Sequence, residues 1–228
     1  MFDRGEPVEL AMGGLRRVVR WGRPWQFDTP AYWIAQAELF APPANYKLGS
    51  TLAEEVTACI LGGFGLPAFV GVRAFEEVRD AGLLDGSCPA AEDIETILRR
   101  PLSIGDRAVR YRFPHQRADR VAAALALLSR SEPPTDGLAL RDWLLQLPGV
   151  GPKTASWVAR NHTGTDCVAI IDIHVLRAGR RAGVFAPSWE PTRDYQRCEA
   201  FFLAWATIGG VRPSVLDACI WSQLSARG

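Results

Sequence analysis

The sequence has 228 residues, of which 48% are hydrophobic and 22% are charged, and its formal net charge is +1. This length and apolar content provide for one large or two small domains with a hydrophobic core. A net charge near zero does not mark the whole chain as a nucleic-acid-binding protein, so such a role would require a local basic surface. No apolar run is long enough to cross a membrane and no signal peptide is evident, which predicts a cytoplasmic protein.

The cysteines are widely spaced and odd in number. None is paired at the spacing of a metal site, and no four-cysteine cluster stands near the C-terminus, which excludes an iron–sulfur centre. We therefore expect reduced, mostly buried thiols. The five residues are Cys59, Cys88, Cys167, Cys198 and Cys219.

The first fifty residues are rich in tryptophan, proline and glycine, as in Trp21-Gly22-Arg23-Pro24-Trp25. Such clusters are typical of turns and loops. We expect residues 1–50 to form an irregular segment that packs against a helical body, with one short helix over residues 30–40.

The next part of the chain predicts a series of helices. Thr51 and Glu54 form a capping-box pattern, which indicates a helix over residues 52–61. A glycine-rich loop, Gly62–Pro67, follows it. Further helices are expected over residues 72–81, 90–100 and 117–130, the last of which is rich in alanine and leucine.

Two groups of arginines give the chain local positive charge. Each group is compatible with a DNA-binding surface or with an ordinary solvated helix face, and we favour the solvated face for the first group. The first group is Arg16, Arg17, Arg20 and Arg23, and the second is Arg107, Arg110, Arg112, Arg117 and Arg120.

The stretch Leu147-Pro148-Gly149-Val150-Gly151-Pro152-Lys153 lies between two amphipathic segments. A short helix over residues 138–146 should end before it, and Pro152 suits the first turn of a second helix over residues 152–160. The two glycines permit a very tight turn and the close approach of another backbone. Free N–H groups at the start of the second helix suit a phosphate, so this element should bind DNA backbone without reading bases.

Lys153 follows this turn directly and is a candidate nucleophile. A lysine side chain in water titrates near 10.4 and is a poor nucleophile at neutral pH. The positive end of a helix and burial in a cleft both disfavour the ammonium form, so they favour the reactive amine. Such an amine can attack a sugar carbon and form a Schiff base.

Asp172 is the only acidic residue in the apolar run Ala169–Ile173. Its carboxylate could stabilise positive charge that grows on a sugar, or orient and deprotonate the nucleophile. It could equally cap a helix that begins near Ile173. Helices are expected over residues 173–182, 192–208 and 213–225.

These residues resemble the helix-hairpin-helix DNA glycosylase superfamily. Lys153 matches the lysine nucleophile of its bifunctional members, and Asp172-Ile173-His174 matches their Asp-x-His segment. The Leu-Pro-Gly-Val-Gly-x-Lys form, the spacing to Asp172 and the absence of a cysteine cluster are most similar to the 8-oxoguanine DNA glycosylase branch.

The resemblance implies an all-α fold of two helical subdomains, with the helix-hairpin-helix motif flanking the active cleft. We expect an irregular N-terminal segment over residues 1–50 that packs with the C-terminal helices. A helical domain should follow over residues 51–185 and include the hairpin at 138–161. Residues 186–228 should supply the helices that complete the cleft.

The activity implied by the resemblance is that of a bifunctional DNA glycosylase and AP lyase in base excision repair. The substrate would be damaged double-stranded DNA, with 8-oxoguanine as the first candidate lesion. The damaged base would flip into a pocket, Lys153 would attack the sugar, and Asp172 would assist. No cofactor is required, and we expect a monomer, associated with the nucleoid if the source is a bacterium or an archaeon.

The resemblance also implies DNA contacts. Gln116 and Arg117, in the loop over residues 111–117, would pry the base pair apart and read the orphaned base, a role that suits arginine. The alternative is a plain surface loop. Contacts to phosphates would come from Gly149, Val150, Gly151 and His174.

Further roles concern the flipped base and a bound ion. Asp217 and Trp221 of the last helix would line the base pocket, and Phe64 would fill the gap left by the extruded base. We favour the alternatives in which Trp221 is a core residue and Phe64 folds back on the core. A structural monovalent cation would be held by the carbonyls of Leu145, Leu147 and Val150.

Two other functions remain open. One is a lyase-type glycosylase for another oxidised or modified base, because the residues of the base pocket determine the lesion and the sequence does not locate them. The other is a non-catalytic helix-hairpin-helix DNA-binding protein, in which the lysine contacts a phosphate and Asp172 only caps a helix.

Overall fold

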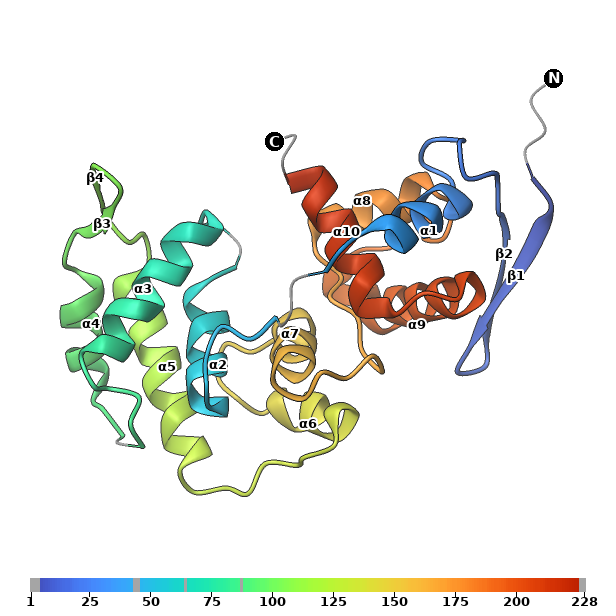
Figure 1. The fold of residues 1–228 in the computed structure, drawn as a ribbon. Helices are drawn as coiled ribbons and strands as arrows, with labels where there is room; N and C mark the ends of the chain where they lie inside the picture. Colours follow the sequence, from blue (N-terminus) through green and yellow to red (C-terminus); the bar gives the residue numbers. More distant parts are fainter. Residues whose placement is uncertain (1–4, 43–45, 64, 87, 226–228) are drawn as a thin grey trace. The chain divides into compact units, whose positions relative to one another are not determined.

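The computed structural model describes residues 5–42, 46–63, 65–86 and 88–225. These residues are mostly helical, as predicted, and form two compact units (Figure 1). Unit 1 combines the N-terminal residues up to 45 with residues 165–228, and unit 2 comprises residues 46–164. Within the described ranges, no helix has the length and apolar character needed to cross a membrane.

This division corrects the predicted domain boundaries. The break falls between Gly164 and Thr165, whereas the sequence analysis placed it at residue 185. Ile171, Val175 and Phe185 are buried in the core of unit 1, together with Trp33 from the N-terminal part of the chain. The apolar side chains after Thr165 therefore find their partners in sequence-distant segments.

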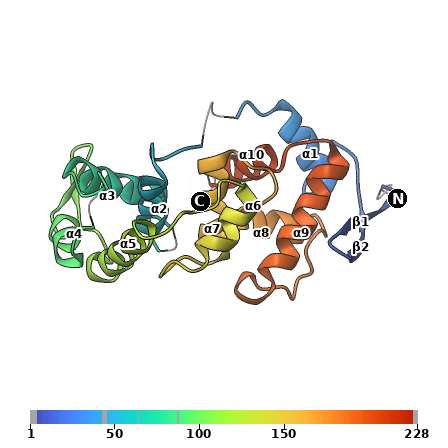
Figure 2. The same cartoon turned by 90° about the horizontal axis from the view of Figure 1, so that it is seen from below.

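Unit 2 is built around α2 (Leu52–Leu61), whose residues from Glu55 to Leu61 are all buried. It packs against α3, α5 and α7, and Figures 1 and 2 show these helices grouped around it. The predicted helix bounds are thus confirmed for α2. The other elements are α3 (Ala68–Asp80), α4 (Ala91–Leu98), β3 (Leu102–Ile104), β4 (Arg107–Val109), α5 (Pro114–Leu128), α6 (Gly137–Leu144) and α7 (Pro152–Thr163).

Local chemistry explains where these helices begin. The Thr51 hydroxyl accepts a hydrogen bond from the Glu54 N–H, which confirms the predicted cap. Helix α3 begins at Ala68 rather than at residue 72, because the Pro67 carbonyl already accepts from the N–H of Val70. Helix α5 begins at Pro114 rather than at residue 117, because a proline is well suited to the first turn.

Unit 1 contains a β-hairpin that the sequence analysis missed. Strands β1 (Pro7–Met12) and β2 (Leu15–Arg20) pair antiparallel, with Met12 opposite Leu15. Gly13 and Gly14 form the turn, and both have positive φ, at 56° and 79°. Two such glycines favour a tight hairpin turn, so the expectation of an irregular segment was wrong here.

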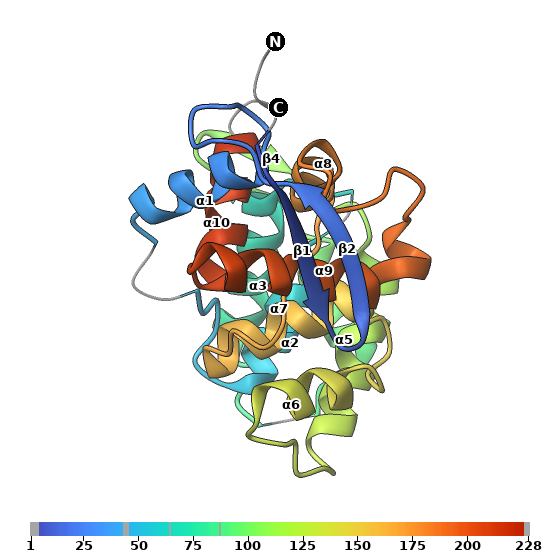
Figure 3. The same cartoon turned by 90° about the vertical axis from the view of Figure 1, so that its right-hand side faces the viewer.

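The hairpin packs through β1 against α9 (Figure 3). Leu10 and Val19, one from each strand, are buried in the core of unit 1. This core is shared by the helices α1 (Pro30–Leu39), α8 (Ile173–Arg181), α9 (Pro191–Gly209) and α10 (Pro213–Ser225).

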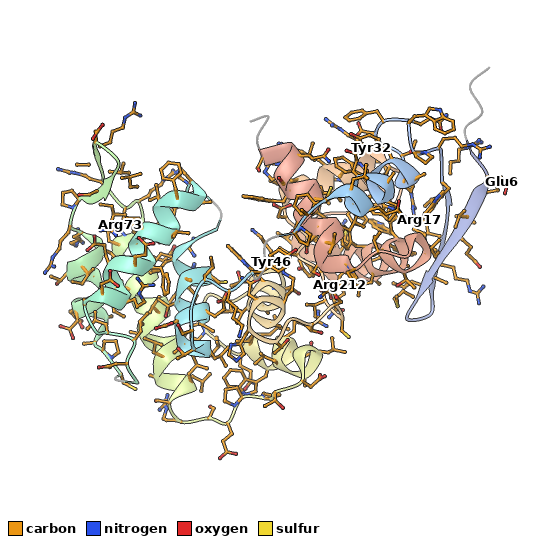
Figure 4. All side chains as sticks on the ribbon, in the orientation of Figure 1. Glu6, Arg17, Tyr32, Tyr46, Arg73 and Arg212 are labelled. Atoms are coloured by element: carbon orange, nitrogen blue, oxygen red, sulfur yellow. The ribbon has the colours of Figure 1, made fainter. Side chains whose placement is uncertain are left out.

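A buried carboxylate joins α2 to α7 and to the segment that enters unit 2. Glu55 is fully buried, and its Oε2 accepts from the backbone N–H groups of Leu48 at 2.8 Å and Gly49 at 3.0 Å. Its Oε1 accepts from the side-chain amide of Asn161 at 2.7 Å. The Arg160 guanidinium donates to Asn161 and lies 4.5 Å from the ring centroid of Tyr46, which is labelled beside α7 in Figure 4.

This network predicts a strong effect on stability. Glu55→Ala would leave the buried Asn161 amide and the part-buried N–H groups of Leu48 and Gly49 without their acceptor, and an unsatisfied buried donor costs about 1–3 kcal/mol. We expect the free energy of unfolding to fall by about 3 kcal/mol or more in urea denaturation. The neighbouring Glu54→Ala is the matched control, because it removes only a partner of the exposed Ser50 N–H and should cost about 1 kcal/mol or less. Equal losses for the two variants would contradict the role assigned to Glu55.

Candidate active site

The predicted hairpin stands between α6 and α7 and is anchored by two apolar side chains. Leu147 and Val150 are 2% and 7% exposed, and the Val150 N–H donates to the Leu147 carbonyl at 3.1 Å. By contrast, Pro148, Gly149 and Gly151 are exposed. The hairpin therefore presents backbone to solvent while its side chains hold it to unit 2.

The two glycines of the hairpin have different roles, which corrects their equal treatment in the sequence analysis. Gly149 has φ +81°, and a Cβ there would lie 2.4 Å from the side chain of Arg120 on α5. Gly151 is the N-cap of α7 with φ −97°, and a Cβ there would meet nothing within 4 Å. Only Gly149 is required by the fold, whereas Gly151 leaves open space at the helix start.

Lys153 is the second residue of α7 and is half-buried. Its Nζ lies 5.6 Å from the ring centroid of Trp157, one turn further along the same helix. The sequence analysis missed Trp157, although its spacing of four residues from the lysine was a usable signal. Burial raises the pKa of the neighbouring Cys59 thiol, and so does the charge of Glu55, whereas the positive charge of Lys153 opposes the rise.

Asp172, in unit 1, is the N-cap of α8. Its Oδ1 accepts from the N–H groups of His174 at 2.9 Å and Val175 at 2.8 Å, which confirms the predicted cap. Among the described residues its Oδ2 has no hydrogen-bond partner, so one carboxylate oxygen remains available. Lys153 is carried by unit 2, so the two predicted catalytic residues belong to different units.

The backbone that leads to Asp172 is held by two buried polar residues of α9. The Tyr195 hydroxyl donates to the Ala169 carbonyl at 2.7 Å and accepts from the Ile171 N–H at 3.3 Å. Glu199 accepts from the Ala169 N–H at 3.0 Å. Tyr195 and Glu199 were not singled out from the sequence, although an acid on the apolar face of a helix indicates a buried partner.

Gln116 and Arg117 lie in the first turn of α5 rather than in a loop. Gln116 is exposed, and the Arg117 guanidinium donates to the Ile60 carbonyl at the end of α2, at 2.7 Å. Burial lowers the pKa of Arg117. Arg117 thus already joins two helices, and the predicted contact of both residues with DNA stays a prediction.

The predicted base-pocket residues differ in burial. Asp217 is 4% exposed, whereas Trp221 is 48% exposed, so the interpretation of Trp221 as a core residue was wrong. Near them, the Gln223 amide donates to Gln36 of α1 at 3.0 Å. Phe64 lies outside the described residues. The structure thus leaves the Trp221 ring accessible for stacking.

The described residues provide no cluster of three or more histidine, cysteine or acidic side chains that could hold a metal ion. The predicted monovalent cation would instead use backbone carbonyls. The Leu147 carbonyl already accepts from Val150, and a carbonyl oxygen has a second lone pair for a cation. The hairpin is therefore compatible with the ion predicted at Leu145, Leu147 and Val150.

Comparison with known proteins shows that this chain is similar to 8-oxoguanine DNA glycosylases. A family model described as 8-oxoguanine DNA glycosylase matches residues 40–209. The 8-oxoguanine DNA glycosylase/AP lyase of Thermotoga maritima is 31% identical over 120 residues, which cover 50% of this chain and 58% of the relative. The chain thus spans little more than half the length of the curated relatives it matches.

Solved structures agree in fold. The 8-oxoguanine DNA glycosylase of Methanocaldococcus jannaschii matches with a TM-score of 0.59 at 27% identity, over 77% of this chain and 78% of its own. A glycosylase/lyase of the same organism, in complex with a 15mer DNA containing 8-oxoguanine, matches with a TM-score of 0.59 at 24% identity. That match covers 86% of this chain and 89% of the other and concerns the fold alone.

The unequal roles of the hairpin glycines yield a prediction. Gly149→Ala should lower the melting temperature and weaken binding to damaged and undamaged duplex alike, because it strains a positive φ and displaces Arg120. Gly151→Ala should leave the melting temperature within error of wild type. Differential scanning fluorimetry and fluorescence anisotropy with both duplexes measure these effects. A loss of affinity in Gly149→Ala that is confined to damaged DNA would contradict a backbone-reading hairpin.

Proposed function

Because the chain belongs to the family of 8-oxoguanine DNA glycosylases, we propose that it is a bifunctional DNA glycosylase and AP lyase. It excises a damaged base from double-stranded DNA, with 8-oxoguanine as the first candidate, as part of base excision repair. The observation that carries the proposal is Lys153 in the first turn of α7, directly after an exposed glycine hairpin.

Binding begins at the hairpin, where the first N–H groups of α7 have no acceptor within the helix. A phosphate of the damaged strand accepts from them, and the open space at Gly151 allows its approach. These contacts hold the backbone without reading sequence. Substrate choice then falls to the pocket that receives the flipped base, for which Asp217 and Trp221 are the candidates.

The reaction uses Lys153 as a nucleophile. Its neutral amine attacks the sugar C1′, the bond from C1′ to the base nitrogen breaks, and the base leaves with a proton. The attacking nitrogen supplies that proton to the base. The C1′–O4′ bond then breaks as the sugar ring opens, O4′ takes a proton from solvent, and a protonated Schiff base forms between Nζ and C1′. Removal of a C2′ proton then allows β-elimination, in which the C3′–O bond breaks and the strand is cut.

Asp172 stabilises the positive charge that develops on the sugar as the base departs. Its Oδ1 is engaged by two backbone N–H groups, which fix the orientation of the carboxylate. Its Oδ2 then supplies a preorganised negative charge. Capping and charge stabilisation are therefore compatible uses of one side chain.

The protein acts as a monomer and needs no cofactor. His174, whose N–H is engaged by Asp172, contributes a phosphate contact, and a structural monovalent cation is held by the carbonyls of the hairpin. A panel of duplexes, each with one lesion and assayed for base release before and after alkali, tests the substrate. The release of another base but not of 8-oxoguanine would redirect the proposal to a different lesion.

The first catalytic prediction concerns Lys153. Lys153→Gln should abolish base release and borohydride trapping on an 8-oxoguanine duplex, because only an amine forms a reducible Schiff base. Affinity for the duplex should change less than about threefold, since the hairpin N–H groups remain. Trapping that survives this substitution would assign the nucleophile to another amine, and normal binding without trapping in the wild type would indicate a non-catalytic protein.

The second concerns Asp172. Asparagine caps a helix about as well as aspartate, so Asp172→Asn should leave the melting temperature unchanged. The loss of one preorganised charge should reduce the single-turnover rate about a hundredfold or more on an 8-oxoguanine:cytosine duplex. Asp172→Ala is the companion variant and should lose both the rate and about 1 kcal/mol of stability. A wild-type rate in Asp172→Asn would restrict this residue to capping.

A further inference from the structure

The segment between α4 and α5 carries concentrated positive charge outside the proposed catalytic machinery. Residues 100–113 contain four arginines and one acidic residue, Asp106. The side chains of all four arginines are exposed. We call this set the arginine cluster: Arg100, Arg107, Arg110 and Arg112.

Acidic side chains do not neutralise the arginine cluster. The side chains of Arg100, Arg107 and Arg110 make no hydrogen bond or ion pair with any residue that the structure describes, and the Arg112 guanidinium lies 5.1 Å from the ring centroid of Phe113. The nearest acid of α4, Glu95, accepts from Arg99 at 2.7 Å and lies 2.8 Å from the His115 ring nitrogen. Two other exposed arginines of unit 2 are paired with acids, Arg79 with Asp80 and Arg99 with Glu95.

The β3–β4 hairpin holds the centre of the cluster in a fixed position. Its strands pair antiparallel, with Ile104 opposite Arg107, and the turn uses Gly105 at φ +56°. Leu102 is 1% exposed and anchors the hairpin in the core of unit 2. In Figure 1 the hairpin projects from unit 2 beside α3 and α4. The backbone that carries these arginines is therefore already ordered, so it loses little conformational freedom when their guanidinium groups bind a ligand.

Helix α5 connects the arginine cluster to Arg120, whose side chain lies beside the hairpin between α6 and α7. The side chain of Arg120 lies so close to Gly149 that a Cβ there would stand 2.4 Å from it. From Arg120, α5 rises about 9 Å to Pro114, and the chain spans at most about 13 Å more to Arg110. At 3.4 Å per base pair, this upper limit of about 22 Å corresponds to roughly six base pairs.

We propose that the arginine cluster binds the phosphodiester backbone of the duplex that flanks the lesion, up to about six base pairs from the phosphate held at Gly149–Gly151. Planar guanidinium groups match the geometry of phosphate oxygens and pair with them in two-pronged fashion. The contact contributes affinity and no base selection. This inference rests on the proposed function in that double-stranded DNA is the ligand of unit 2.

The salt dependence of binding tests the inference. The slope of log K against log salt concentration is negative, and each lost phosphate contact reduces its magnitude by about 0.9 for duplex DNA. The double variant Arg107→Ala/Arg110→Ala should therefore reduce the magnitude of this slope by nearly 2. It should also weaken binding about tenfold or more near 0.1 M salt. Arg79→Ala/Arg130→Ala is the matched control, because it removes the same charge from exposed positions of unit 2 outside the cluster.

Duplex length supplies the second arm. On undamaged duplexes with arms of about three base pairs around the centre, the cluster has no phosphate to bind, so wild type and double variant should bind alike. Arms of about twelve base pairs should restore the difference, and extending one arm at a time identifies the side of contact. Equal slopes for wild type and double variant on long duplexes, or an equal loss in the control, would overturn the proposal and leave another partner for this surface.

The two proposals fail in different ways. Single-turnover base release at saturating enzyme should be unchanged in the double variant, because the cluster does not touch the reacting sugar. A wild type that releases no base from any lesion would overturn the proposed function, whereas unchanged slopes with normal base release would overturn only the role of the arginine cluster.

Discussion

A single buried carboxylate determines how unit 2 is assembled. A buried charge without partners costs several kcal/mol, so α7 must take the one position in which Asn161 reaches Glu55. The same contact sets the direction of α7 relative to α2. Asn161 of α7 lies beside Glu55 of α2. Lys153 stands two turns before Asn161, and its positive charge opposes the rise that burial causes in the pKa of Cys59, which stands one turn after Glu55. The position of the proposed nucleophile thus follows from an ordinary requirement of burial.

Unit 1 uses the same principle for its own functional residue. Tyr195 and Glu199 of α9 satisfy backbone groups of Ala169 and Ile171, so side chains of α9 hold the backbone of the segment before α8. This places Asp172 at the first position where its side chain can cap α8. In both units, buried polar groups on one helix define the backbone that presents a reactive side chain.

The sequence predicted what is governed by neighbouring residues and missed what depends on distant ones. The Thr51 cap, the hairpin between α6 and α7 and the Asp172 cap are short-range features and were recognised. The Gly13–Gly14 turn was equally local, but the surrounding tryptophans and prolines obscured it. The partner of Glu55 is 106 residues away, and no local pattern reveals it. Trp221 was misjudged because an aromatic residue on an apolar helix looks like core until its neighbours are known.

The path of the chain through the two units has a consequence for its synthesis. Unit 2 is continuous in sequence, so its whole core is synthesised before the helices α8, α9 and α10 of unit 1. The N-terminal hairpin and α1 must wait with Leu10 and Trp33 uncovered until α9 and α10 emerge. Closing such distant contacts is slow, and the waiting segment exposes apolar surface and strand edges meanwhile. The β1–β2 hairpin and α1 are therefore the parts of the nascent chain most open to misassembly and chaperone binding.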